Sequence, residues 1–502
     1  MKGFLAMGAR VAAAAALACA FIVLNSSSAQ GQAGIALAPE PWLSGTWVAT
    51  LTHDGDARPL ALRFEPKEGG VFSVDLTSPA IHVWDAPIAQ ATVEGNQVRI
   101  GKSLVFDYDP AARTLSGAVP KSLVPVHPMQ ATFRKTTLER APRTELRGPV
   151  ASPVWVFDTG ARVWADVAYA DGVVYAGDAD GRVHALEART GRELWVFRAG
   201  GPIRARPIRA GAALFVHADD GFLYKIAAAS GAELFKVRVD GKPIVRLPPE
   251  NQQSRFDVFA SAAAVDRGRV YVGTHDGHVL ALGDADGRRL WDFTAGDSVS
   301  STPVVEAGCL YFGSFDGNVY ALSAASGELA WKRDTGAPVV STPAVHDGHV
   351  IVGSRSYDLM ALQADDGTPV WTRYIWFSWV ESPATVRDGV VYVGSSDAAR
   401  LFAFDARTGL PSWDLDVHGW AWGQPAVTDT RVFIGTSAAP HYLVAHDSAF
   451  LAVDRKTGQV AWRFPMAPPG GDATYGFTAS PAVAEGLVFT GALDGKVYAF
   501  AQ

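Results

Sequence analysis

Cysteine is almost absent from this chain of 502 residues, which has only two. Cys19 lies in the N-terminal apolar run, so Cys309 has no partner within the chain once that run is removed. We therefore expect no disulfide, although the chain has the features of an exported protein. The spacings CxxC and CxxCH are also absent. Their absence argues against structural zinc, a redox-active dithiol and covalently attached haem.

Positive charge is scarce as well. The formal net charge is -7 and no basic run stands out, so no nucleic-acid partner is expected. Motifs for a nucleophile elbow, a zinc protease, a phosphate loop or a dinucleotide site do not occur in a supporting context. Acid–glycine turns such as 177–181 and 284–287 lack the closing Glu of a calcium loop. We interpret them as hairpin turns, and no metal ligand or catalytic residue is assigned.

The first 29 residues have the pattern of an export signal. Lys2 and Arg10 precede an apolar run from 11 to 24, and a small-residue cleavage site follows Ala29. The run is short for a membrane span of about 20 residues, so no span is expected after its removal. Apolar residues continue past Cys19, which argues against a lipid anchor there. The sequence predicts a periplasmic or secreted protein.

Glycine and tryptophan are abundant, with 50 and 15 residues. The clearest unit is residues 312–331, FGSFDGNVYALSAASGELAW. Asp316-Gly317 and Ser326-Gly327 separate three alternating runs, and such pairs are typical of hairpin turns because Gly accepts positive φ. One three-stranded meander cannot bury both of its faces, so the unit needs neighbours.

The aromatic residue that closes this unit recurs roughly every 40 residues, which is typical of a β-propeller. The marks are Trp155, Trp195, Phe235, Trp291, Trp331, Trp371, Trp413 and Trp462. Eight marks predict eight blades over residues 151–502. The last copy stops at Gln502 before its own Trp strand. We therefore predict that the strand around Trp155 completes the last blade and removes its open edge.

Residues 40–136 have a different β pattern, which does not repeat. Short alternating runs are separated by turns such as 68–70 and 94–96, which predicts a small antiparallel barrel or sandwich. Residues 137–150 are interpreted as a linker. The opening Gly45-Thr46-Trp47 loosely resembles a lipocalin-like module of secreted bacterial proteins. A ligand cup and a domain used only for packing or spacing both remain open.

The turn before each closing aromatic also repeats. The positions Ala185, Thr190, Gly191 and Trp195 match Ala321, Ser326, Gly327 and Trp331. This pattern is similar to the tryptophan-docking motif of the pyrroloquinoline-quinone (quinoprotein-type) eight-bladed propellers. The resemblance covers residues 151–502 and implies that each Trp stacks between blades against a neighbour's Ala and Gly.

One copy departs from the motif. Lys225 replaces Ala and Phe235 replaces Trp, so a weaker blade junction is expected there.

The resembling family contains calcium- and quinone-dependent dehydrogenases and also non-catalytic propellers such as the scaffold of outer-membrane assembly. The adjacent cysteines that many of the enzymes carry are absent here, as is a Glu, Asn and Asp set in matching positions. We therefore predict a non-catalytic protein-interaction or ligand-binding scaffold without a cofactor. One alternative is a quinone-dependent periplasmic oxidoreductase with pyrroloquinoline quinone and calcium near Asp166, Arg204 or Arg206. Another is a carbohydrate or cell-wall binder, because aromatic platforms stack on sugars.

The candidate site lies in the loops that lead into the first strand of each blade, since these loops reach the central channel and one rim. They are unusually aromatic and charged at Trp164, Asp166, Arg204, Arg206, Trp376, Trp379, Glu381, His418, Trp420, Trp422 and Tyr475. An exposed surface of this composition is typical of recognition. The alternative is that these residues plug the channel or pack under the small domain.

Two insertions, 240–259 and 437–450, could shape the same face. We expect a monomer that binds an envelope protein or a small ligand, with β-augmentation as one binding mode.

Overall fold

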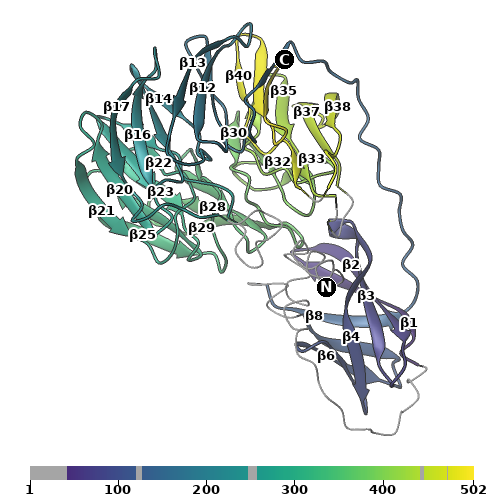
Figure 1. Ribbon diagram of the computed structural model, residues 1–502. Coiled ribbons are helices and arrows are strands. Elements are labelled where there is room, and N and C mark those ends of the chain that lie inside the picture. Colours follow the sequence, from purple (N-terminus) through teal and green to yellow (C-terminus); the bar gives the residue numbers. More distant parts are fainter. Residues whose placement is uncertain (1–41, 120–126, 247–256, 441, 443–445, 472) are drawn as a thin grey trace, which may run out of the picture. The chain divides into compact units, whose positions relative to one another are not determined.

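We describe a computed structural model of the chain, which covers residues 42–119, 127–246, 257–440, 442, 446–471 and 473–502. The proposed export signal, 1–29, and parts of both insertions lie outside these residues. In the part that is described, no helix has both the length and the apolar character needed to cross a membrane. The chain divides into two compact units, an N-terminal barrel and a propeller, and each is described by itself (Figure 1).

The N-terminal unit is a closed antiparallel barrel, which decides between the barrel and the sandwich expected from the sequence. Its strands are β1 (Gly45–His53), β2 (Asp56–Pro66), β3 (Phe72–Ser78), β4 (Val83–Glu94), β5 (Gln97–Ile100), β6 (Leu104–Asp109), β7 (Thr114–Val119) and β8 (Met129–Lys135), with a 3-10 turn η1 (Pro79–Ile81). β1 closes the barrel by pairing with both β2 and β8. Alternation places Trp47, Phe64, Phe72 and Phe133 in its core, where each is almost fully buried.

The second unit is an eight-bladed β-propeller, as the repeat predicts. The first four sheets are β10 (Ala168–Ala170), β11 (Val173–Gly177), β12 (Arg182–Glu187) and β13 (Glu193–Arg198); β14 (Ile208–Ala210), β15 (Ala213–His217), β16 (Phe222–Ala227) and β17 (Glu233–Arg238); β18 (Ala264–Asp266), β19 (Arg269–Gly273), β20 (His278–Gly283) and β21 (Arg289–Thr294); β22 (Val304–Glu306), β23 (Cys309–Gly313), β24 (Asn318–Ser323) and β25 (Leu329–Asp334). They are blades 1 to 4.

Blades 5 to 8 follow the same order. They are β26 (Ala344–His346), β27 (His349–Gly353), β28 (Asp358–Gln363) and β29 (Pro369–Tyr374); β30 (Thr385–Arg387), β31 (Val390–Gly394), β32 (Arg400–Asp405) and β33 (Pro411–Asp416); β34 (Ala426–Val427), β35 (Arg431–Gly435), β37 (Ser448–Asp454) and β38 (Val460–Met466); β40 (Ala482–Ala484), β41 (Leu487–Gly491), β42 (Lys496–Ala501) and β9 (Trp155–Asp158). β9 thus supplies the outer strand of blade 8, where Trp155 pairs with Ala499. A short pair, β36 (Ser437–Ala438) with β39 (Tyr475–Gly476), lies outside the blades.

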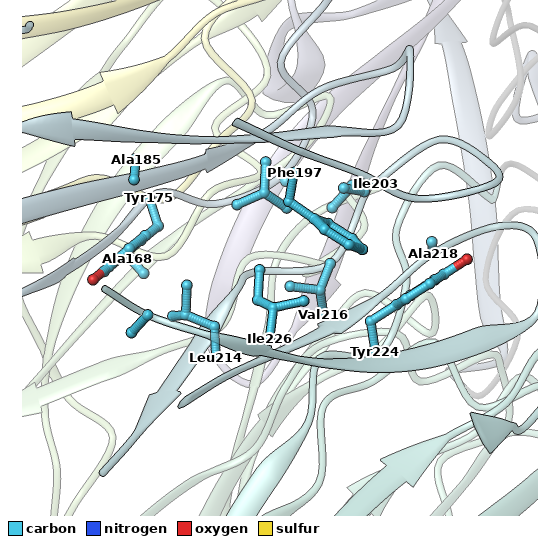
Figure 2. Packing of buried hydrophobic residues seen from close by; sticks show 13 residues of the cluster. Ala168, Tyr175, Ala185, Phe197, Ile203, Leu214, Val216, Ala218, Tyr224 and Ile226 are labelled. Atoms are coloured by element: carbon cyan, nitrogen blue, oxygen red, sulfur yellow. The ribbon is translucent and has the colours of Figure 1, made fainter. Parts of the chain in front are cut away.

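Apolar residues from adjacent blades form the core of the propeller. Between blades 1 and 2, Tyr175 and Phe197 of the first sheet pack against Leu214, Val216 and Ile226 of the second (Figure 2). Similar clusters occupy the other junctions, so each blade buries its two faces against its neighbours.

The closing tryptophans are structural wedges between blades. The Trp331 side chain of blade 4 donates from Nε1 to the Ala364 carbonyl of blade 5 at 2.8 Å. Its ring covers Gly367, where a Cβ atom would lie 2.6 Å from the ring. Gly367 also has a φ of 72°, so the small residue is required for both space and backbone conformation. This is the docking geometry that the resemblance implies.

The departing copy keeps this arrangement by different means. Phe235 of blade 2 covers Gly287 of blade 3 but has no N–H group. Lys225 replaces that donor, since its Nζ lies 2.5 Å from the Asp284 carbonyl oxygen. The same Nζ lies 5.6 Å from the centre of the Phe235 ring. The expected weakness of this junction stays a prediction, and the lysine contact opposes it.

Candidate functional site at the channel mouth

The loops before the inner strands have equivalent positions in most blades. In these loops an apolar residue packs against the preceding blade; Ile203, for example, lies where a Cβ atom on Gly177 would approach it to 2.4 Å. We call the position after this apolar residue the mouth position. In blades 1, 2, 4, 6 and 7 it is Trp164, Arg204, Ser300, Glu381 and Trp422.

A chain of buried ion pairs begins at blade 2. Asp219 accepts hydrogen bonds from Nε of Arg204 and Nε of Arg246, both at 3.1 Å. Arg246 also reaches Asp257 with an N–O distance of 2.8 Å. The Arg204 guanidinium lies 5.5 Å from the centre of the Trp164 ring. Arg246 of the first insertion is therefore tied to Asp219 of blade 2 and to Asp257 by charge pairs with little access to water.

Asp257 connects this cluster to blades 3 and 4. Burial alone would raise its pKa, but the hydrogen bond with His275 at 3.1 Å and the charge of Arg246 lower it to about 2. Ser300 donates to the same carboxylate at 3.2 Å. Asp257 is therefore ionised at neutral pH and serves as an anchor between blades 3 and 4.

A second buried pair lies on the blade 5 and blade 6 side. Arg355 binds Glu381 through Nε at 2.7 Å and Nη2 at 2.6 Å. The guanidinium is also 4.4 Å from the Trp379 ring and 5.2 Å from the Phe315 ring, within the range of cation–π attraction. Burial raises the pKa of Glu381 in spite of the neighbouring Arg355 charge.

Stacked aromatic residues occupy the blade 7 side. The rings of Trp420 and Trp422 are 4.9 Å apart and nearly parallel. Trp420 donates from Nε1 to Asp397 at 3.1 Å, and Trp422 donates from Nε1 to Ser396 at 3.3 Å. Both indoles are therefore fixed by polar partners in blade 6 as well as by stacking.

The last described residues of the first insertion contact several of these groups. Phe259 meets the edge of Trp422 with 6.3 Å between ring centres, and it packs with Val258, Trp164 and Leu493. Two residues earlier, Asp257 is bonded to Ser300 of blade 4. Residues 257–259, which we call the mouth segment, therefore extend from blade 4 to blades 1, 7 and 8 across the channel mouth.

The structure brings only some of the predicted site residues together. Trp164 contacts Arg204. Trp379 and Glu381 both contact Arg355. Trp420 stacks on Trp422.

The other predicted residues have different surroundings. Asp166 accepts a hydrogen bond from the Ser480 backbone N–H at 2.6 Å and so helps to close the ring of blades. Trp376 packs edge-on against Tyr374, and His418 lies 3.5 Å from Asp447. Tyr475 is buried in β39, and Arg206 is half-buried.

Four of the predicted tryptophans are buried, since Trp164, Trp376, Trp420 and Trp422 are each only 4 to 6% exposed. Trp379, Arg204 and Arg206 are half-buried. The four buried tryptophans therefore form no exposed aromatic surface, and a role of the predicted residues in recognition stays a prediction.

The sequence reasoning missed Asp219, Arg246, Asp257 and Arg355 as members of the site. For Arg355 a signal was present, since it stands in a turn at the position that Phe315 occupies in the clearest repeat. For Arg246 and Asp257 the only signal was their location in an insertion. Nothing in the repeat pairs Arg246 with Asp219, because the contact joins an inserted loop to a blade turn.

Comparison with known proteins agrees with this fold. The family model described as outer membrane protein assembly factor BamB matches residues 151–291, 275–378 and 375–502. The chain belongs to the BamB family. BamB from Moraxella catarrhalis is similar in structure, with a TM-score of 0.52 and 19% identity over 70% of this chain and 98% of that one.

Enzymes share the same propeller. Quinohemoprotein alcohol dehydrogenase from Comamonas testosteroni has a TM-score of 0.54 and 15% identity over 70% of this chain and 76% of that one. A 1-butanol dehydrogenase (quinone) from Thauera butanivorans is 33% identical over 111 residues, which are 20% of this chain. The chain spans only 16% of the length of that curated relative. Membership of the BamB family therefore does not by itself decide between a scaffold and an enzyme.

Three mouth carboxylates bear on whether a quinone held with calcium would fit here. Asp219, Asp257 and Glu381 are each paired with arginine. Both contacts of Glu381 involve Oε1, and its buried Oε2 has no hydrogen-bond partner among the described residues. Among the described residues no group of three or more His, Cys, Asp or Glu side chains could hold a metal ion. Val258 and Phe259 pack beside Trp164, and Phe259 also meets the edge of Trp422.

Proposed function

We propose that this BamB-family propeller is an exported, non-catalytic scaffold that binds a segment of another envelope protein. The observation that carries the proposal is the internal pairing at the channel mouth. Arg204, Arg246 and Arg355 neutralise the mouth carboxylates, and these charges come from the same chain. A catalytic site needs carboxylates and cations that are available to a substrate.

The family supports a role in assembly, since BamB is described as an assembly factor of the outer membrane. The N-terminal apolar run supports export to the periplasm or the cell exterior. Fractionation of cells that express the full chain tests this location. A mature chain recovered with the cytoplasmic proteins would contradict export.

Reconstitution tests the non-catalytic assignment. The purified full chain is mixed with pyrroloquinoline quinone and calcium, passed through a desalting column and examined by absorption spectroscopy, with a quinone alcohol dehydrogenase as the positive control. We expect no quinone absorption with the chain at micromolar cofactor and no alcohol-dependent dye reduction. Stoichiometric retention of the quinone would overturn the scaffold proposal and favour the oxidoreductase.

The carbohydrate alternative depends on accessible aromatic platforms. Because the mouth tryptophans are buried, this observation does not favour sugar stacking there. A glycan array with the full chain tests the alternative directly, and specific binding to one glycan class would revive it.

A further inference from the structure

The outer strands of the blades differ in how they protect their free edges. Each sheet ends at its outer strand, and except in blade 7 one row of its backbone N–H and C=O groups has no strand partner among the described residues. Proteins commonly place charges on such edges to prevent pairing with other chains. Directly after the closing aromatic, β21, β25 and β33 carry the charged residues Asp292, Lys332 and Asp414.

β13 and β9 have an apolar residue at this position, although Glu193 and Arg198 at the two ends of β13 are charged and exposed. The position after the closing aromatic is Val196 in β13 and Val156 in β9, and these side chains are 45% and 46% exposed. The residue before the aromatic is also apolar and exposed, as Leu194 is in β13. Leu194 lies at a bulge where the register between β12 and β13 shifts, and Leu194 and Val196 both expose apolar side chains on the outer strand of blade 1.

The chain itself shows that an outer edge of this propeller accepts another extended segment. The Arg463 N–H of β38 donates to the Pro149 carbonyl at 2.9 Å, and the Ala151 N–H donates to the Arg463 carbonyl at 2.8 Å. Val150 thus forms a parallel bridge with Arg463 on blade 7. The linker covers this edge by backbone pairing, and it then continues directly into β9.

We propose that the free edge of β13 binds an extended segment of a partner protein by β-augmentation, with apolar partner side chains at alternate positions. This inference rests on the proposed scaffold function. The occupant follows from the chemistry of the edge. Unpaired backbone groups of a six-residue strand require an extended backbone, and Leu194 with Val196 favours β-branched or aliphatic neighbours.

Blade 4 provides a matched control. Ala330 of β25 occupies the position of Leu194 relative to the closing aromatic, and it is exposed as well. A lysine at either position adds the same charge to an outer edge. Only the change at Leu194 should affect a segment bound at β13.

Fluorescence anisotropy tests the proposal with the full mature chain. The probe is a fluorescein-labelled peptide of alternating valine and threonine with a lysine at each end. The comparison peptide carries N-methyl groups on alternate residues, which removes backbone donors from one edge. We expect the plain peptide to bind, the methylated peptide to bind at least about tenfold more weakly, and Leu194→Lys to weaken binding by a similar factor. Ala330→Lys should leave it unchanged.

Equal binding to both lysine variants, or no binding of the plain peptide, would overturn the assignment. Light scattering of the unmodified chain supplies one more outcome. A dimer that Leu194→Lys converts to a monomer would show that the edge pairs with a second copy instead, and would also overturn the proposal. Quinone retention would count against the scaffold function alone, so failure of the two proposals can be distinguished.

Discussion

Two blade junctions solve the same packing problem with different chemistry. At the regular junction of blades 4 and 5, the carbonyl of Ala364 accepts from the Trp331 indole at 2.8 Å and from the Tyr311 hydroxyl at 3.2 Å. Ala321 lies opposite Trp331 and leaves room for the ring. The junction therefore has one aromatic wedge and two neutral donors.

At the junction of blades 2 and 3 both of these donors are missing. Phe235 replaces the tryptophan, and Phe215 stands where the tyrosine would be. Lys225 replaces both donors through its bond to the Asp284 carbonyl. The comparison teaches that the repeat preserves a contact between backbone and side chain, and that the residues which supply it can change.

The irregular side of the ring also depends on more buried charge. His217 stands where the regular blades have a glycine, and its ring bonds to Asp240 at 2.9 Å and to the Ser261 carbonyl at 2.9 Å. The insertion that follows is held by Arg246. Removing one member of a buried pair leaves a charge without its partner, so single substitutions here should cost more than at the regular junctions.

The largest effect is expected for Arg246→Gln. Asp219 and Asp257 would both lose a buried cation, which should lower the free energy of unfolding of this region by about 4 kcal/mol. Hydrogen exchange of the amides in β15 and β18 reports this local loss, and Arg198→Gln on the exposed face of β13 serves as the control. Exchange that is equal in the two variants would show that the ion pairs do not hold the insertion.

Asp240→Asn should produce the next largest loss, about 3 kcal/mol, and the loss should depend on pH. Burial alone would lower the pKa of His217, but the hydrogen bond and charge of Asp240 raise it above 6.5. A raised histidine pKa contributes stability that is fully present below the unfolded value of 6.5 and disappears as pH rises through the folded value.

The free energies of unfolding of the unmodified chain and of Asp240→Asn should therefore differ more at pH 5.5 than at pH 9. Burial alone would raise the pKa of Asp240, yet the hydrogen bond with His217 lowers it, so its own contribution is lost only at acidic pH. Urea unfolding at both pH values measures the difference. If the difference in free energy of unfolding is the same at both pH values, or is larger at pH 9, this result would contradict protonation of His217 in the folded state.

The propeller and its closure could be predicted from the sequence because they depend on local, repeated features. Gly turns, alternating strands and one aromatic wedge per repeat are read within a single unit, and the isolated Trp155 indicates how blade 8 is completed. The mouth could not be predicted in the same way. Phe259 and Arg246 belong to an insertion without a periodic counterpart, and their contacts join elements from different blades.

Composition also could not decide whether the mouth is open. Tryptophan and arginine are favoured in recognition surfaces and in filled interiors that pair each polar group. The decisive fact is the path of residues 257–259, which depends on bonds from Asp257 to Arg246 and Ser300. Those bonds are tertiary contacts and leave no mark on the local pattern.

A smaller effect, about 2 kcal/mol, is expected for Lys225→Ala. The Asp284 carbonyl, in a partly buried contact, would lose the donor that replaces the missing indole and hydroxyl, and an acceptor left without a donor costs roughly 1–3 kcal/mol. The double variant with Phe235→Trp should recover most of the loss, since the indole N–H would supply the bond. Hydrogen exchange in β16 and β17 measures both. A double variant no better than the single one would show that the lysine acts by other means.

Trp331→Phe should have the smallest effect, about 1 kcal/mol, because the Tyr311 hydroxyl still donates to the Ala364 carbonyl after the indole is lost. With this change the junction of blades 4 and 5 resembles the junction of blades 2 and 3, except that the Tyr311 hydroxyl remains as a donor. The double variant Trp331→Phe with Tyr311→Phe should lose as much stability as Lys225→Ala. Adding Ala321→Lys to this double variant should restore part of the lost stability. Urea unfolding of the series measures the steps. If Ala321→Lys restores no stability, then the lysine contact at the junction of blades 2 and 3 depends on the shape of that junction as well as on the donor. The two junctions are then not interchangeable.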